Sequence, residues 1–444
     1  MPPTFSIISL GCPKNLVDAE RLVAVLEGAS YQMELDPAQA EIILVNTCGF
    51  IEQARQESLQ TIAEMARLKQ TGRCRGLVIT GCLSQRYPQA LWEQIPSVDA
   101  FLGIGSQDDI VSVCQQILDG TDSRPSLIHD PHSLVEETIP RHQLTLRHTA
   151  YLKIADGCDN RCAYCAIPNI RGAYRSRKLE ILEQEAREMA AWGVRELNLI
   201  AQDTTHYGTD LYGQPRLTEL LDRLCRIDDL RWIRLLYTPP AHYTEELIDL
   251  IAAQENICKY LDIPLQHICD DLLAAMNRRI TQQQILDLLE KLRARIPGLT
   301  LRTTFIVGLP GETEGHFRQL LQFVQQSRFQ KLGAFSYSPE QGTPAAQMPG
   351  RAPKGVADRR LDELLQLQRQ ISLERNRALA GEEVTVLVDA TISGDQWNFV
   401  GRTQAEAPDI DGHIYLHGRD VHPGEFVHAQ VTGFSEYDLF AEII

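Results

Sequence analysis

The stretch Cys158-Asp159-Asn160-Arg161-Cys162-Ala163-Tyr164-Cys165 places three cysteines within eight residues. Thiolates at this CxxxCxxC spacing suit three irons of a 4Fe-4S cube and leave the fourth iron open to bind a substrate or cofactor. A structural zinc site is the alternative, but zinc ligands usually come as CxxC pairs and a fourth ligand is needed. The stretch therefore predicts a 4Fe-4S cluster with one open iron.

Six apolar runs, separated by helical patterns, begin just before this stretch and continue after it. We expect strands near residues 150–154, 196–201, 232–237, 260–265, 301–307 and 333–338. Six β/α units predict a partial (β/α)6 barrel, which would carry its active site at the carboxyl ends of the strands. Because the cysteine stretch follows the first strand, its cluster is expected at the mouth of this barrel.

The amino-terminal region carries three further cysteines, each within a few residues of the end of an apolar run. The runs 5–10, 41–45 and 76–80 alternate with helical patterns, which predicts a parallel sheet, and they lead to Cys12, Cys48 and Cys82. The carboxyl ends of parallel strands share one edge, so these cysteines should meet there and provide three ligands for a second cluster. Three buried, inert thiols are the alternative.

The carboxy-terminal region changes character again. A long amphipathic segment, 357–380, ends at Gly381 in the manner of a helix C-cap. Short alternating runs then follow at 384–388, 398–400, 414–416, 426–431 and 437–440, which predicts a small all-β barrel of the oligonucleotide-binding style. The predicted class is α/β, with an amino-terminal parallel α/β domain at 1–122, a central barrel at 141–378 and the small barrel at 381–444.

Composition limits the possible functions. With 444 residues, two or three domains are expected, and the start of the chain shows neither a signal peptide nor a membrane span, so we expect a cytoplasmic protein without membrane contact. Eleven cysteines are too sparse for a disulfide scaffold, and Cys74, Cys114, Cys225, Cys258 and Cys269 are interpreted as packing residues. The net charge is −16, and residues 381–444 carry twelve acidic residues against two basic ones, which argues against strong nucleic-acid binding.

The segments 151–158, 167–172 and 175–177 resemble the radical S-adenosylmethionine methylthiotransferases. That family combines this central cluster loop with three spread cysteines in an amino-terminal domain and a carboxy-terminal TRAM domain, so the resemblance covers essentially the whole chain. Residues 9–15 and 46–51 look like the branch that modifies ribosomal protein uS12, the RimO type. The rival branch, the MiaB type, modifies tRNA adenosine and usually shows Gln and Met after the first cysteine. A non-catalytic iron-sulfur carrier is a second rival.

The resemblance implies two 4Fe-4S clusters and S-adenosylmethionine as cofactors. Cys158, Cys162 and Cys165 would hold the cluster whose open iron binds S-adenosylmethionine, and no catalytic residue is expected beyond the cluster ligands. One electron would then give the 5'-deoxyadenosyl radical, which takes hydrogen from the β-carbon of an aspartate of uS12. The second cluster, on Cys12, Cys48 and Cys82, would hold the inserted sulfur, and another S-adenosylmethionine would methylate that sulfur.

Weaker predictions concern residues outside the cysteine sets. Candidate S-adenosylmethionine contacts are Tyr164, Gln202, Asp203, Gln266, Arg302 and Gly308. His267 is interpreted as structural, and the basic group Arg171, Arg175, Arg177 and Lys178 as a complement to the cluster or to the acidic target. Acidic residues of loop 406–411 are expected to meet Lys and Arg of uS12, either free or on the small subunit. An electron donor such as flavodoxin or ferredoxin and a sulfur source complete the expected partners.

Overall fold

The structure is a computed structural model, and it describes residues 1–121, 124–131, 140–393 and 396–444. The chain forms two compact units, of which the first comprises residues 1–144, 155–181 and 340–346 and the second comprises residues 145–154, 182–339 and 347–444. The domain boundary predicted at residue 122, part of the connecting stretch that follows it, and Asp395 of the acidic tail lie outside the described residues.

A six-stranded parallel sheet forms the centre of the first unit, in the order β2-β1-β3-β4-β5-β6. Its strands are β1 (Thr4–Ser9), β2 (Gln32–Met33), β3 (Ile42–Thr47), β4 (Gly76–Gly81), β5 (Ala100–Leu102) and β6 (Ser126–Leu127). The three strands predicted from apolar runs are confirmed. The sequence did not reveal β2, β5 and β6, because strands of two or three residues are too short to show a period.

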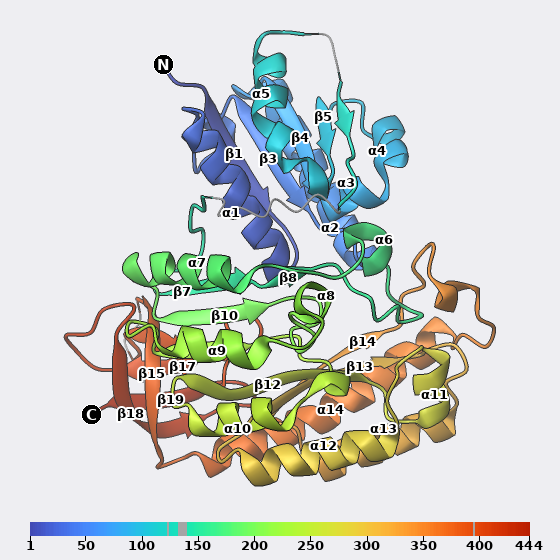
Figure 1. Cartoon of the computed structure of the whole chain (residues 1–444), viewed down its shortest axis with the longest axis vertical. Coiled ribbons are helices and arrows are strands. Elements are labelled where there is room, and N and C mark those ends of the chain that lie inside the picture. Colours follow the sequence, from blue (N-terminus) through green and yellow to red (C-terminus); the bar gives the residue numbers. More distant parts are fainter. Residues whose placement is uncertain (122–123, 132–139, 394–395) are drawn as a thin grey trace. The chain divides into compact units, whose positions relative to one another are not determined.

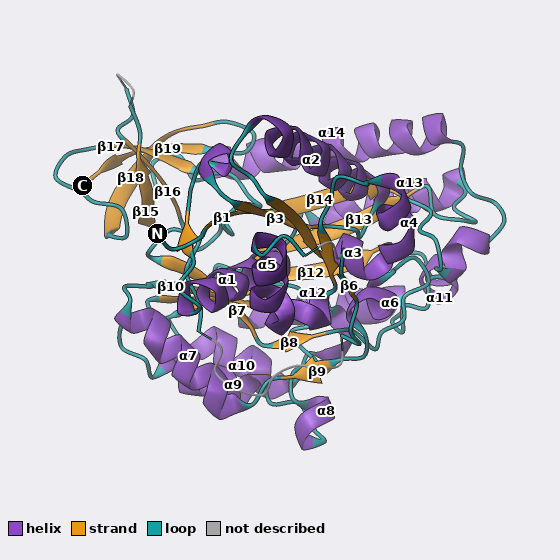
Figure 2. Cartoon of the chain, turned by 90° about the horizontal axis from the view of Figure 1, so that it is seen from above, coloured by secondary structure: helices purple, strands orange, loops and turns teal. Residues whose placement is uncertain are grey.

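Helices cover both faces of this sheet. They are α1 (Pro13–Gly28), α2 (Glu52–Thr71), α3 (Cys82–Arg86), α4 (Pro88–Gln94) and α5 (Ile110–Leu118), with 3-10 turns at Pro37–Gln39 and Ile104–Asp109. Helices α1 and α5 lie on one side of β1 and β3, and α2 lies on the other (Figure 2). Successive strand residues enter opposite cores, Leu44 with α1 and Val45 with α2, so β3 and β4 are buried throughout.

The predicted cluster stretch also belongs to the first unit. It lies between two short strands that pair antiparallel, β8 (Ala155–Asp156) and β9 (Arg175–Ser176), and is followed by helix α6 (Ile167–Arg171). Helix α6 packs against α3, where Ala166 and Ile170 bury the side chain of Cys82. The loop that carries one predicted cysteine set is thus packed against the helix that starts at a member of the other set.

The second unit contains the predicted central sheet, which is parallel throughout and has the order β14-β13-β12-β11-β10-β7. Its strands are β7 (Thr149–Lys153), β10 (Glu196–Ile200), β11 (Trp232–Leu235), β12 (Ile257–Gln266), β13 (Thr300–Val307) and β14 (Lys331–Ser336). All six predicted strands are confirmed, and so is the partial barrel, which Figure 1 shows with its helices along one side of the sheet.

The helices between these strands follow the chain order of a β/α barrel. They are α7 (Leu179–Ala191), which begins in the first unit, α8 (Thr209–Tyr212), α9 (Leu217–Cys225), α10 (Glu245–Ala253), α11 (Asp270–Ala275), α12 (Gln282–Arg295) and α13 (Glu314–Ser327), with 3-10 turns at Pro240–His242 and Pro344–Gln347. The predicted long helix is α14 (Lys354–Ala378), which packs on α13 and β14 and leads to the carboxy-terminal barrel.

That barrel is closed by five strands in the order β15-β16-β17-β19-β18, as predicted. The strands are β15 (Glu383–Thr391), β16 (Phe399–Arg402), β17 (Ile414–His417), β18 (Phe426–Phe434) and β19 (Leu439–Ile443). Inward residues such as Val386, Ile414 and Ala441 alternate with outward polar ones and fill the centre.

The prediction that the acidic residues of loop 406–411, between β16 and β17, bind uS12 is wrong for two of them. Glu406 is buried and pairs with Lys331 of β14 at 3.1 Å, and the Asp411 carboxylate accepts a hydrogen bond of 2.7 Å from the Tyr260 hydroxyl. Asp409 is exposed, yet it accepts a hydrogen bond from Tyr151 at 3.2 Å. This loop therefore fastens the small barrel to the central sheet, and Glu406 and Asp411 are not available to bind uS12.

Candidate iron-sulfur site

The three amino-terminal cysteines lie where neighbouring parallel strands end. Cys12 is the N-cap of α1 after β1, Cys48 follows β3 directly, and Cys82 is the first residue of α3 after β4. Since β3 lies between β1 and β4 in the sheet, the three loops are adjacent at one edge. The sequence prediction that these cysteines share the carboxyl edge of one sheet agrees with this arrangement.

Glycines beside the cysteines allow the loops to approach closely. Gly11 has a φ of +90°, and a Cβ there would lie 3.0 Å from Cys48 Sγ. Gly81 has a φ of +96°, and a Cβ there would lie 2.4 Å from Asn46 Oδ1 and 2.6 Å from the Thr47 carbonyl oxygen. A larger residue at either position would push a cysteine away from its neighbours.

The thiols influence one another electrostatically. Burial raises the pKa of Cys48 to about 12, with a further contribution from the nearby Cys82 thiolate and a smaller one from Cys12. Burial likewise raises the pKa of Cys82, which Cys12 raises further. Thiols that raise each other's pKa in this way are close together. Binding of metal ions to these sulfurs would release their protons.

This donor set fits an iron-sulfur cluster better than a single ion. Within the described ranges, no group of three or more His, Cys, Asp or Glu residues is arranged to hold one metal ion. A 4Fe-4S cube is larger, because its thiolates bind three different irons and need not converge on one point. Two buried thiols, Cys48 and Cys82, and the half-buried Cys12 at one sheet edge suit three irons of such a cube.

Asn15 connects all three loops. Its side-chain amide donates to the carbonyls of Leu10 at 2.8 Å and Thr47 at 3.1 Å, and its backbone carbonyl accepts from Asn46 Nδ2 at 2.6 Å. Its Oδ1 also lies 3.8 Å from Cys82 Sγ as a hydrogen-bond acceptor. Fully buried and bonded to each strand end, Asn15 fixes the spacing of the cysteine loops.

Arg171 joins these loops to the CxxxCxxC loop. Its Nη1 donates to both carboxylate oxygens of Asp156, and its Nη2 donates to Asp18 at 2.9 Å, to Asn15 Oδ1 at 3.2 Å and to Cys82 Sγ at 3.6 Å. The guanidinium is 1% exposed. Burial lowers the pKa of Arg171, but the nearby Asp156, Cys82 and Asp18 raise it by more than burial lowers it. The pKa therefore lies above the ordinary value, and the guanidinium stays charged.

Backbone hydrogen bonds shape the CxxxCxxC loop itself. The Cys158 amide donates to the Gly172 carbonyl at 3.1 Å, and the Cys165 amide donates to the Cys162 carbonyl at 3.0 Å. The Asp159 carboxylate accepts from the Tyr174 amide at 3.1 Å. The three cysteines and Tyr164 of this loop are half-buried, so their side chains are accessible from one side.

Three predicted contacts lie at strand carboxyl ends in the second unit. Asp203 follows β10 and is 1% exposed, and its carboxylate accepts hydrogen bonds from Thr205 Oγ1 at 2.8 Å and the His206 amide at 3.1 Å. Gln202 precedes it and is half-buried. Gln266 ends β12 with a φ of +71°, and among the described atoms its buried Oε1 has no hydrogen-bond partner. Strain of this kind is concentrated at functional sites.

The remaining predicted contacts have structural partners. Arg302 is the third residue of β13, nearer its amino end, and donates to Asp262 at 2.8 Å. The Gly308 amide donates to Glu312 at 2.5 Å, and a Cβ there would lie 2.7 Å from Ala357 Cβ. His267 is buried, as expected of a structural histidine, and its Nδ1 accepts a hydrogen bond from the Cys269 amide.

The other cysteines behave as predicted for packing residues. Cys74, Cys114, Cys258 and Cys269 are buried and Cys225 is partly buried, and all five are free thiols. Sequence reasoning missed the roles of Asn15 and Asp18. Their position, three and six residues after Cys12, was the available signal, because one helical turn brings residue 15 back to the face of the N-cap.

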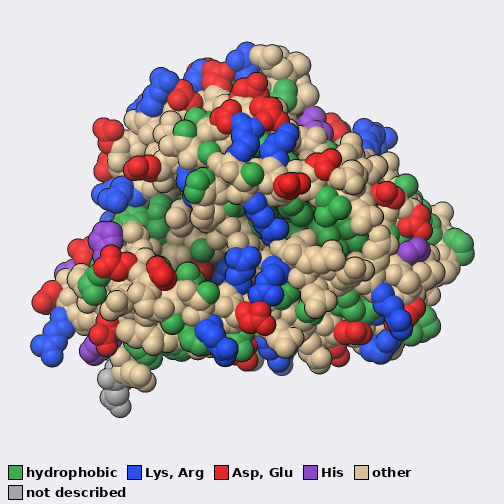
Figure 3. All heavy atoms as spheres, turned by 90° about the horizontal axis from the view of Figure 1, so that it is seen from below, with side chains coloured by type: hydrophobic (Ala, Val, Ile, Leu, Met, Phe, Trp, Pro, Cys, Tyr) green, Lys and Arg blue, Asp and Glu red, His purple; other side chains and the backbone are tan. Residues whose placement is uncertain are grey.

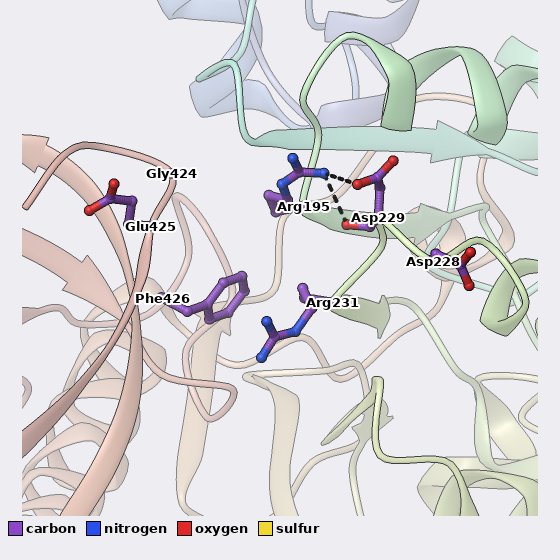
Figure 4. Close-up of a pocket in the computed structure, with 7 residues that line it drawn as sticks. All are labelled: Arg195, Asp228, Asp229, Arg231, Gly424, Glu425 and Phe426. Carbon is purple, nitrogen blue, oxygen red and sulfur yellow. Dashed lines mark hydrogen bonds and ion pairs between the residues drawn. The ribbon is translucent and has the colours of Figure 1, made fainter.

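A cavity of about 460 Å³ lies in the second unit, far from any cysteine set in the sequence. Arg195 and Arg231, at the amino ends of β10 and β11, line it with Asp228, Asp229 and residues 424–426 (Figure 4). Arg195 is paired with Asp229 at 2.8 Å. Barrel chemistry belongs to the opposite, carboxyl ends of the strands, so we do not assign this cavity to the reaction.

The surface carries both signs of charge. On the face seen in Figure 3, Lys and Arg side chains are interspersed with Asp and Glu side chains. Within the part of the chain that the structure describes, no helix combines the length and the apolar character needed to cross a bilayer.

Comparisons with known proteins give three family matches. A model described as Radical SAM superfamily matches residues 152–324, one described as uncharacterized protein family UPF0004 matches residues 4–103, and one described as TRAM domain matches residues 380–444. The structure of the radical S-adenosylmethionine methyltransferase TsrM from Kitasatospora setae has a TM-score of 0.58 at 16% identity, covering 88% of this chain and 79% of that one. At this identity the similarity concerns the fold alone.

Curated relatives match over the full length. The ribosomal protein uS12 methylthiotransferase RimO of Desulforamulus reducens is 46% identical over 442 residues, which cover 99% of each chain. The protein of the same name from Geobacter sulfurreducens is 47% identical over 442 residues, which cover 99% of this chain and 98% of the relative.

Proposed function

Because this chain belongs to the ribosomal protein uS12 methylthiotransferase family, we propose that it inserts a methylthio group at the β-carbon of an aspartate of uS12. Membership of the radical S-adenosylmethionine superfamily implies S-adenosylmethionine and one 4Fe-4S cluster. The observation that carries the proposal is the packing of two three-cysteine sets within one compact unit of a chain from this family.

Cys158, Cys162 and Cys165 are proposed to hold the first cluster. When bound, the cluster and S-adenosylmethionine would supply the 5'-deoxyadenosyl radical that removes hydrogen from an unactivated carbon. The chain contributes the loop geometry: Gly172 and Cys162 carbonyls fix the backbone of Cys158 and Cys165. The half-buried thiols leave room for a cofactor beside them.

Cys12, Cys48 and Cys82 are proposed to hold a second 4Fe-4S cluster that carries the sulfur to be inserted. Gly11 and Gly81 let the three loops approach, and Asn15 holds their spacing. Burial of Cys48 and Cys82 keeps water from the sulfurs. The half-buried Cys12 leaves one side of the set accessible.

We further propose that Tyr164, Gln202, Asp203 and Gln266 contact S-adenosylmethionine, with Arg302 and Gly308 as the least supported contacts. Gln266 has the best local support, since its backbone is strained and its buried Oε1 has no partner among the described atoms. Arg302 and Gly308 already have partners in Asp262 and Glu312.

The partners follow from the proposed reaction. They are uS12, an electron donor such as flavodoxin or ferredoxin, and a source of sulfur, and the place of action would be the cytoplasm, where ribosomes are made. A tRNA-modifying activity is less well supported, because residues 381–444 carry a net charge of −10. A non-catalytic carrier would not need the β/α barrel of the second unit.

Mass spectrometry tests the proposal in cells that lack their own methylthiotransferases. Expression of this chain should add a methylthio group to one aspartate of uS12 and leave tRNA adenosine unchanged. A methylthio gain on adenosine would transfer the protein to the tRNA branch, and no gain on either substrate with both clusters intact would overturn the enzymatic proposal. Variants C12A and C158A, each missing one ligand, should abolish the uS12 product.

A further inference from the structure

Arg171 occupies an unusual position between the two cysteine sets. It is the last residue of α6, six positions after Cys165, and its guanidinium reaches the sulfur of Cys82 on the first turn of α3. The helices that carry Arg171 and Cys82 pack together through Ala166 and Ile170. Neither the position nor the contact depends on the arrangement of the two units, because every residue concerned lies in the first unit.

We propose that Arg171 is a positioning residue that donates a hydrogen bond to the Cys82 sulfur and thereby raises the reduction potential of the second cluster. The inference rests on the proposed function, since it takes Cys82 as a ligand of that cluster. A cluster gains negative charge when it takes up an electron, and an N–H donor or a nearby cation stabilises the sulfur ligands of that reduced state.

The surroundings of Arg171 set its orientation. Asp156 accepts from Nη1 with both oxygens, which fixes the plane of the guanidinium. Asp18 and Asn15 share Nη2 with Cys82, so this one nitrogen serves two oxygens and a sulfur. With the guanidinium held from both sides, the contact with Cys82 is a fixed part of the site rather than a chance approach of a flexible side chain.

The charges around Arg171 do not cancel its effect on the sulfur. Asp18 and Asp156 are both buried and together outweigh its single positive charge. However, Arg171 Nη2 donates to Cys82 Sγ itself at 3.6 Å, whereas the carboxylates of Asp18 and Asp156 accept hydrogen bonds from the guanidinium. Coulomb interactions fall with distance, and the directional N–H contact acts on the sulfur itself.

A variant that retains only the second cysteine set isolates its cluster. In the full chain with Cys158, Cys162 and Cys165 all replaced by Ala, reconstitution should give about four irons per chain. If this parent binds no iron, the proposed second cluster fails and the inference falls with it. If it binds iron, the effect of Arg171 is measured separately in the same background.

Arg171→Lys keeps a positive charge but lacks the planar fork that reaches Asp156 and Cys82 together. Redox titration of R171K should show a tenfold lower ratio of reduced to oxidised cluster at the potential where the parent is half reduced, which corresponds to a midpoint lower by about 59 mV for one electron. Arg141→Lys is the matched control, because the Arg141 side chain is likewise buried in the first unit and pairs with a buried carboxylate, that of Glu20, and its potential should be that of the parent. Equal potentials for R171K and the parent would overturn the proposal.

A second pair of variants decides the matter if R171K does not load iron. Asp18→Asn and Asp156→Asn each remove one carboxylate from Arg171, but only Asp18 shares Nη2 with Cys82. D18N should raise the potential more than D156N, because it frees the nitrogen that faces the sulfur. Equal shifts of the reduction potential in the two variants would show that only the overall charge matters, and would refute the hydrogen bond as the cause.

Discussion

Arg402 of the carboxy-terminal barrel pairs with Glu196 of the central sheet at 2.7 Å, and both side chains are buried. Arg402 also donates to both oxygens of Asp389, and Glu196 accepts a second guanidinium from Arg234. Arg402 is one of only two basic residues in the acidic segment 381–444. The segment therefore uses one of its few cations to attach the barrel to the sheet.

Replacing Arg402 should destabilise the second unit. Arg402→Met leaves the buried carboxylates of Glu196 and Asp389 short of a counter-charge, and a loss of this kind costs about 3–5 kcal/mol. Urea unfolding measures the change. Arg419→Met, at the other, exposed arginine of the segment, should stay within about 0.5 kcal/mol of the parent. Equal stability of R402M and R419M would show that the ion pairs contribute little.

Charge reversal at Asp411 should affect stability rather than substrate affinity alone. Asp411 accepts hydrogen bonds from Tyr260 and from the Ala407 amide, so Asp411→Lys buries an unpaired ammonium beside Arg302 and should cost at least about 2 kcal/mol. Asp420→Lys, at an exposed acidic residue of the same barrel, is the control. If D411K unfolds like D420K but binds uS12 more weakly, the loop contacts the substrate after all.

Gly81→Ala should remove the second cluster selectively. An added Cβ would collide with Asn46 and Thr47 and displace Cys82, whereas Gly120, which also has a positive φ, has nothing within 4 Å of the added atom. Iron analysis of the reconstituted full chain should fall from about eight to about four irons for G81A and remain near eight for G120A. Full iron loading of G81A would contradict the assignment of Cys82 as a ligand.

Because of His267, we expect the second unit to lose stability at acidic pH. Burial lowers its pKa to about 3, so the folded state holds it neutral while the unfolded chain protonates it near pH 6.5. The unfolded state thus binds more protons below pH 6.5, and the free energy of unfolding should fall by up to about 1.4 kcal/mol per pH unit between pH 6.5 and 3. Urea titrations of the iron-free chain at pH 7.5 and 5.5 measure the loss.

His267→Asn is the matched variant for this measurement. Its amide oxygen can accept from the Cys269 amide as Nδ1 does, but it does not titrate. H267N should therefore lose less stability than the parent between the two pH values. The same loss in both proteins would assign the acid sensitivity to other groups.

Local patterns explain why the main elements could be predicted. The strands from β10 to β13 contain short runs rich in apolar residues, and the CxxxCxxC spacing lies within a single loop, so both are visible without knowledge of the fold. The parallel order then places Cys12, Cys48 and Cys82 at one edge. Sequence spacing does not identify the partners of the predicted contacts outside the cysteines. Arg302 is an example, because its partner Asp262 lies on a neighbouring strand.

Residue types and short-range periodicity were sufficient to reveal the two cysteine sets, the strands of the central sheet and the acidic tail. The use of the charged side chains became visible only in the folded chain. Arg171 reaches Cys82 across 89 residues and Asn15 across 156, and loop 406–411 turns its acids onto the central sheet. A buried charge needs a partner in space, and the chain must be folded before it is known which carboxylate or sulfur lies within reach.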